Sequence, residues 1–70
     1  MNIFWDIVFR RVGDSLEETG RYEDVDAARA DYLYMTQEHP EDYEYVCLRQ
    51  IETDYNAEED ITQLDIWYAE

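Results

Sequence analysis

The chain has 70 residues, of which 19 are Asp or Glu, five are Arg and none is Lys, so its formal net charge at pH 7 is -14. A charge of this sign and size repels nucleic acid and anionic membrane surfaces and attracts basic partners. Because 46% of the residues are hydrophobic and 16% are aromatic, the chain differs from a disordered acidic segment, and we expect one folded domain over residues 1–70.

Cysteine usage and the N-terminal residues bear on location. Cys47 is the single cysteine, which excludes an internal disulfide and favours a reducing, intracellular compartment. The N-terminus lacks the basic start and long apolar run of a secretory signal, and no segment approaches the length of a membrane span. We therefore expect a cytoplasmic protein that does not associate with membranes.

Residues 2–12 are predicted to form a strand. Period-two alternation places Ile3, Trp5, Ile7 and Phe9 on one face and leaves Phe4, Val8 and Val12 on the other, so both faces are apolar. Such a strand is either central in its sheet or uses its second face to meet a partner. Turn-forming residues follow, and a short strand over 19–23 would return antiparallel to the first.

A helix is predicted to begin after Asp24, which is a suitable N-cap, and to run through good helix formers from Val25 to Met35. Pro40 ends it, because the residue before a proline is pushed out of the helical region. Helical spacing predicts one face made of the following residues: Val25, Ala28, Arg29, Tyr32, Met35 and Thr36.

Residues 43–53 are predicted to form a strand that is again apolar on both sides. Residues 61–68 have strand composition and would form a hairpin with it, and we favour this interpretation. A helix stays open as the alternative, since Asn56 and Glu59 match a capping box. The predicted fold class is α+β: a small antiparallel sheet (ββαββ) with one helix packed on one face.

Acidic residues gather in three segments between near-neutral scaffold elements. Segments 13–26, 38–44 and 52–60 carry net charges of -5, -4 and -5. We predict that partner-binding residues come from these segments: Glu17, Glu18 and Glu23; Glu41, Asp42, Tyr43 and Glu44; and Glu52, Asp54, Tyr55, Glu58, Glu59 and Asp60.

Catalytic and metal sites are not expected. Ser15, His39 and Cys47 offer no nucleophile with an adjacent base and an orienting third group, so we predict that the protein is not an enzyme. The acids of 54–65 partly match a calcium loop, but Glu59 stands where the loop needs glycine and Asp65 replaces the bidentate Glu. We predict no metal and no cofactor.

The acidic segments can imitate a phosphate backbone. Acids two apart on an extended chain, such as Glu52 and Asp54, project to the same side about 6.7 Å apart, close to the phosphate repeat of one nucleic-acid strand. Proteins hold those phosphates with Lys and Arg, so a carboxylate array can enter the same basic channel. Tyr55 lies within the 52–60 segment and is predicted to contact the partner. The competing interpretation is that these are solvated loop charges that maintain solubility.

The chain resembles small acidic phage-encoded inhibitors of host nucleic-acid enzymes. The resemblance rests on its size, its expected sheet-plus-helix layout and its acid clusters 13–26, 38–44 and 52–60. This class includes anti-CRISPR and anti-restriction DNA mimics, and the resemblance involves no diagnostic motif. It implies a stoichiometric inhibitor that binds a basic, nucleic-acid-binding surface of a host protein, such as a CRISPR effector, and does not bind nucleic acid itself.

A different class of function is the alternative. The second sheet face, through Phe4, Val8, Val46 and Leu48, would serve a non-enzymatic interaction module that forms a homodimer or docks on a host enzyme such as RNA polymerase.

Overall fold

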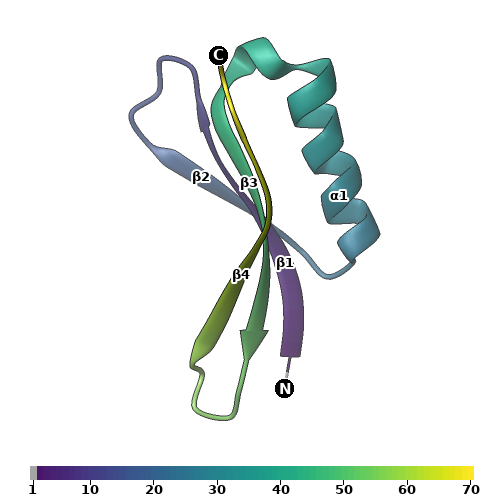
Figure 1. Cartoon of the computed structure of the whole chain (residues 1–70). Coiled ribbons are helices and arrows are strands. Elements are labelled where there is room, and N and C mark those ends of the chain that lie inside the picture. The colour runs from purple at the N-terminus through teal and green to yellow at the C-terminus, as the bar shows by residue number, and fades with distance from the viewer. Residues whose placement is uncertain (1) are drawn as a thin grey trace.

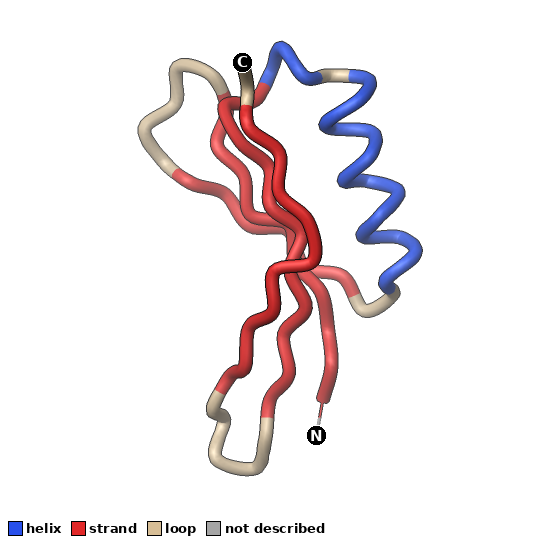
Figure 2. The backbone as a smooth tube through the Cα atoms, in the orientation of Figure 1, coloured by secondary structure: helices blue, strands red, loops and turns tan. Residues whose placement is uncertain are grey.

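The structure is a computed structural model that describes residues 2–70; the predicted domain also includes Met1, which lies outside the described residues. One four-stranded antiparallel sheet carries a single helical segment across one of its faces (Figures 1 and 2). In chain order the elements are β1 (Asn2–Arg11), β2 (Glu17–Tyr22), α1 (Val25–Leu33), the π-helical turn η1 (Tyr34–Glu38), the 3-10 turn η2 (Pro40–Asp42), β3 (Tyr43–Thr53) and β4 (Glu59–Tyr68).

The α+β class and the strand at 61–68 are confirmed. The strands lie in the spatial order β2-β1-β3-β4, which differs from their order along the chain. The two central strands are therefore β1 and β3, which have apolar residues on both faces. Strand β2 begins two residues earlier than predicted, because Glu17 and Glu18 are paired with Arg10 and Phe9 of β1.

The helix begins and ends where local signals place it. The Asp24 side chain accepts a hydrogen bond from the backbone N–H of Asp26 at 3.0 Å, as an N-cap residue does. At the other end the helix widens into the π-helical turn η1, where the Thr36 hydroxyl donates to the Tyr32 carbonyl at 2.9 Å. Pro40 then opens η2, so the helical segment is finished before β3.

The core lies between the helix and the sheet. It consists of Ile7, Val46 and Leu48 from the sheet and Ala28, Tyr32 and Met35 from the helical segment. The predicted helix face is thus confirmed for its three central members. Arg29, predicted on the same face, is exposed, because at the edge of this face a long charged side chain reaches water.

The second face of the sheet differs from the predicted one. Register pairs Phe9 with Val46 and Ile7 with Leu48 on the helix side, so Val46 and Leu48 are fully buried beneath the helix. The predicted patch of Phe4, Val8, Val46 and Leu48 is therefore wrong as a single surface. Phe4 and Val8 share the uncovered face with their register partners, the β3 residues Ile51 and Cys47.

An ion pair lies at the centre of this uncovered face. Arg49 donates from Nε and Nη2 to the two carboxylate oxygens of Asp6 at 2.8 and 2.7 Å. Asp6 is 5% exposed, so its charge depends on this partner. The same hydrogen bonds raise the pKa of Arg49. On the neighbouring strand, the Arg21 guanidinium lies 3.6 Å from the centre of the Phe4 ring.

Among residues 2–70, no helix has the length and apolar character needed to cross a membrane.

Replacing Asp6 tests the buried pair. In Asp6→Val the Arg49 guanidinium loses its partner, and we expect the free energy of unfolding to fall by about 2 kcal/mol. The double variant Asp6→Val with Arg49→Met removes both charges and is expected to be more stable than the single variant. Urea denaturation measures both. A single variant as stable as the parent would show that the pair contributes nothing.

One buried tyrosine, Tyr32, and one partly buried tyrosine, Tyr22, predict loss of stability at high pH. Burial and a hydrogen bond to Asp31 raise the pKa of Tyr22 to about 12. Burial and the nearby Asp65 carboxylate raise the pKa of Tyr32 to about 12. Because the unfolded pKa is about 10, their contribution is complete below pH 10 and is lost as pH rises through about 12.

Urea unfolding midpoints should therefore stay nearly constant from about pH 9 to about pH 10 and then fall up to about pH 11.5. The double variant Tyr22→Phe with Tyr32→Phe should flatten this dependence. An equally steep decline in the double variant would assign the effect to other groups.

Candidate partner-binding surface

The hairpin loop 54–58, between β3 and β4, is organised by the first of its acids. The Asp54 carboxylate accepts hydrogen bonds from the backbone N–H groups of Asn56 at 2.9 Å and Glu58 at 3.2 Å. The Asp54 carbonyl accepts from the N–H of Ala57 at 3.1 Å, and Ala57 has a positive φ of 60°. Asp54 therefore shapes the loop as well as charging it, a role that Asn, Asp and Ser commonly take in turns.

Three of the other hairpin acids, Glu52, Glu59 and Asp60, lie close together on the paired strands. Glu52 lies directly opposite Asp60, and Thr53 lies opposite Glu59. Like charges facing each other across strands are unfavourable. The salt bridges among residues 2–70 involve none of the five acids Glu52, Asp54, Glu58, Glu59 and Asp60. The hairpin is thus a fold-supported array of carboxylates that no salt bridge among residues 2–70 compensates.

Tyr55 lies at the tip of this array and is fully exposed, with a relative accessibility of 101%. An aromatic ring at a loop tip gives a large contact area at low entropy cost, and its face attracts guanidinium and ammonium groups. The geometry is compatible with the predicted contact role of Tyr55.

The acids at the opposite end of the sheet are partly compensated. Arg10 forms an ion pair with Glu44, and the Arg11 Nε lies 2.8 Å from a carboxylate oxygen of Glu18. The Tyr45 hydroxyl donates a hydrogen bond to Glu17, which raises the pKa of Tyr45. Sequence analysis missed this compensation, because the arginines are 34 and seven residues from their acids along the chain.

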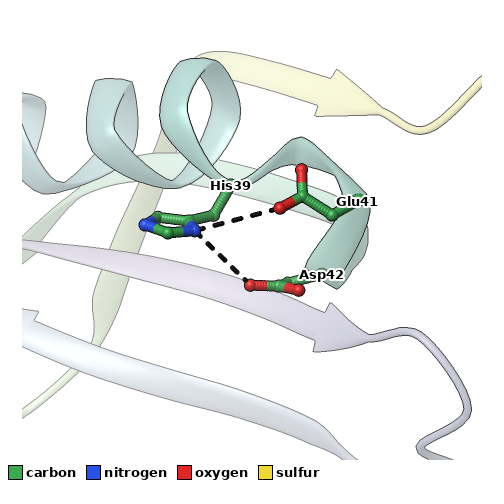
Figure 3. A group of neighbouring side chains, drawn as sticks. All are labelled: His39, Glu41 and Asp42. Carbon is green, nitrogen blue, oxygen red and sulfur yellow. Dashed lines mark ion pairs between the residues drawn. The ribbon is translucent and has the colours of Figure 1, made fainter.

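His39, Glu41 and Asp42 form a small cluster beside η2 (Figure 3). The His39 Nδ1 lies 4.0 Å from a carboxylate oxygen of Glu41 and 3.7 Å from one of Asp42. The other ring nitrogen is 2.8 Å from the Tyr34 hydroxyl. These are the side chains through which this turn could hold a cation, and their contacts are also those of an ordinary exposed ion pair.

The predicted binding residues do not form one surface. Glu41, Asp42, Tyr43 and Glu44 surround the start of β3, whereas the 52–60 hairpin lies at its end (Figures 1 and 2). An 11-residue strand spans roughly 35 Å. Because β1 and β3 are antiparallel, the end of β1 and the acidic turn after it lie beside the start of β3, away from the hairpin.

The remaining predicted residues divide between these two ends. Glu17 and Glu18 lie beside the start of β3, opposite Arg10 and Phe9. Glu23 lines a depression with Phe4 and Arg21, and Glu59 lines a neighbouring depression that shares those two residues. Glu23 therefore belongs with the hairpin end.

The calcium-loop alternative finds no support in this geometry. The loop that precedes Glu59 joins two strands and contains only five residues, and Asp60 and Asp65 lie within β4. A calcium loop of this type instead needs 12 residues between helices.

Comparisons of the chain with protein-family models, with curated proteins and with solved structures found no match.

The strained residue of the hairpin loop provides a stability test. A left-handed backbone costs a non-glycine residue roughly 1 kcal/mol, which glycine avoids. We expect Ala57→Gly to raise the free energy of unfolding by about 0.5 kcal/mol, after the added flexibility of the unfolded chain is counted. Urea denaturation measures the difference.

Ala27→Gly, on the exposed side of α1, is the matched control and should lower stability by about 1 kcal/mol. Equal losses in the two variants would mean that Ala57 carries no strain.

Proposed function

We propose that this protein is a non-catalytic inhibitor of the phage-encoded type that binds a basic, nucleic-acid-binding surface of a host protein. A CRISPR effector or another defence nuclease is the class of target, and the site of action is the host cytoplasm. The observation that carries the proposal is the 52–60 hairpin, where five carboxylates without a cationic partner among residues 2–70 surround an exposed tyrosine.

Electrostatics supports this assignment over solvated loop charge alone. A net charge of -14 produces a field that accelerates encounter with a basic surface. The hairpin acids would exchange water and counterions for Lys and Arg, the groups that a nucleic-acid channel uses to hold phosphates. Backbone pairing between Glu52 and Asp60 holds these carboxylates together before binding, which reduces the ordering cost.

The two ends of the sheet have different roles in this proposal. The hairpin provides the main charged contact, because no salt bridge within the described part of the chain compensates its acids. At the other end Arg10 and Arg11 already neutralise Glu44 and Glu18. Tyr55 supplies the aromatic contact at the tip of the 52–60 hairpin.

A role without catalysis is consistent with the environment of the nucleophile candidates. Cys47 is 8% exposed, and burial raises the pKa of its thiol, which works against the thiolate that a nucleophile needs. The His39 ring lies within hydrogen-bonding or ion-pair distance of Tyr34, Glu41 and Asp42, none of which is a nucleophile candidate.

Docking through an apolar sheet face receives less support. On the uncovered face Val8, Cys47 and Ile51 are 7%, 8% and 2% exposed, so they offer little apolar surface to a partner. Two copies of a chain with this net charge would also repel each other.

Affinity capture from a bacterial lysate tests the proposal. The immobilised protein should retain a nucleic-acid-binding protein at about 50 mM salt, and duplex DNA should release it. The complex should weaken steeply as salt rises to about 300 mM, since each charge contact is screened. Retention that tightens with salt, or that DNA does not disturb, would support the apolar alternative and reject mimicry.

Charge-matched variants locate the contact. The triple variant E58Q/E59Q/D60N should weaken binding of the captured and purified partner at least tenfold, on the order expected when close charge pairs are lost. The control D14N/D26N/E38Q changes the net charge equally, but its exposed positions lie outside the hairpin. Titration calorimetry should find its affinity within about threefold of the parent. Equal losses in both variants would mean that only net charge matters.

A further inference from the structure

A cavity of about 520 Å3 opens where the end of β1, the turn η2 and the end of β4 meet. In Figure 1 the C-terminal end of β4 lies beside the turn that follows the helix. Apolar walls come from Val12, Pro40, Tyr43 and Trp67, and Glu41 and Glu70 add two carboxylates. The volume lies within the range typical of pockets for small ligands.

Backbone and ring contacts hold this cavity in shape. The Val12 N–H donates to the Asp42 carbonyl at 3.0 Å, and the Ala69 N–H donates to the Glu44 carbonyl at 2.9 Å. The Tyr43 ring stands edge-on to Phe9, with centroids 5.6 Å apart and an interplanar angle of 90°. Tyr43 and Trp67 also pack against the buried core. The aromatic walls are therefore preorganised.

Other aromatic rings of this sheet are faced by the chain's own arginines. The Arg21 guanidinium lies 3.6 Å from the Phe4 ring centre, and those of Arg10 and Arg11 lie 5.5 and 5.7 Å from the rings of Tyr45 and Phe9. The cavity lining combines the aromatic residues Tyr43 and Trp67 with Glu41 and Glu70 and includes no Lys, Arg or His. Outside the lining, His39 Nδ1 lies 4.0 Å from a carboxylate oxygen of Glu41. A cation is the chemical complement of such a site.

We propose that this cavity receives an arginine side chain of the basic partner protein. The inference rests on the proposed function and adds a second contact at the sheet end opposite the hairpin. A planar guanidinium can stack on the Trp67 or Tyr43 ring while its N–H groups reach Glu41 and Glu70, whereas an ammonium is a compact, strongly hydrated charge that cannot stack in this way.

Nuclear magnetic resonance titration of the whole isotope-labelled chain with N-acetyl-arginine amide tests the cavity. The Trp67 indole N–H and the amides of Val12 and Tyr43 should shift and saturate at roughly millimolar ligand. The Trp5 indole N–H, which donates to Gln50 at 3.2 Å, is the internal reference and should not move. The lysine analogue should bind more weakly. The citrulline analogue, a neutral isostere of arginine, should cause no comparable shift.

Two variants complete the test. Glu41→Gln with Glu70→Gln should weaken the arginine analogue about fivefold, as expected for two partly exposed ion pairs. Asp14→Asn with Asp26→Asn makes the same charge change at exposed positions outside both the cavity and the hairpin and should leave the titration unchanged. Equal shifts with the citrulline analogue, an unchanged response in the Glu41 and Glu70 variant, or shifts confined to residues 52–60 would overturn the proposal.

The titration contains no partner protein and leaves the hairpin intact. A negative titration would therefore reject the arginine site without touching the proposed function. Failure of the lysate capture would reject the proposed function and leave the titration interpretable.

Discussion

The register of β1 against β3 is the constraint on which the rest of the structure depends. A slip of one residue would move every side chain of these central strands to the other face. The observed register places Ile7 against Leu48 beneath the helix and Asp6 against Arg49 on the opposite face. There the carboxylate and guanidinium satisfy each other with two hydrogen bonds. A slipped strand would bury Asp6 under the helix without that partner, which is costly, so hydrophobic burial and charge pairing select the same register.

The distribution of acid follows from this arrangement. Segments 1–12 and 45–51, which supply most of the two central strands, each carry a net charge of +1, and most carboxylates lie in the connections and at the strand ends. At one end Arg10 and Arg11 reach Glu44 and Glu18. At the other end, the salt bridges of the described residues 2–70 include none to the 52–60 hairpin. The described residues form an elongated body of 40 × 25 × 15 Å with unequal charge at the two ends of its sheet, and the proposed function depends on this asymmetry.

In the proposed function, a protein of this shape would contact a basic partner at two separated points. The hairpin would provide charge and one exposed ring, whereas the Tyr43 and Trp67 cavity would take a single cationic side chain. Two modest contacts joined by a stiff sheet reinforce each other when the partner presents both at the matching distance. The helix contributes to this indirectly, because Tyr32 and Met35 pack against the sheet between the two points.

Most of the secondary structure could be predicted from the sequence because its signals are local. Asp24 caps the helix by accepting a hydrogen bond from a residue two positions away. Pro40 restricts the backbone of the residue directly before it. The alternation in 43–53 is a pattern within one strand. The sequence by itself also determined the net charge and the acid-rich segments. Only the tertiary structure decided which strands are neighbours, that Val46 and Leu48 lie under the helix, that the acidic segments separate to opposite ends, and that Trp67 meets Glu41. These outcomes depend on pairings between residues far apart in the chain, which periodicity within one segment cannot specify.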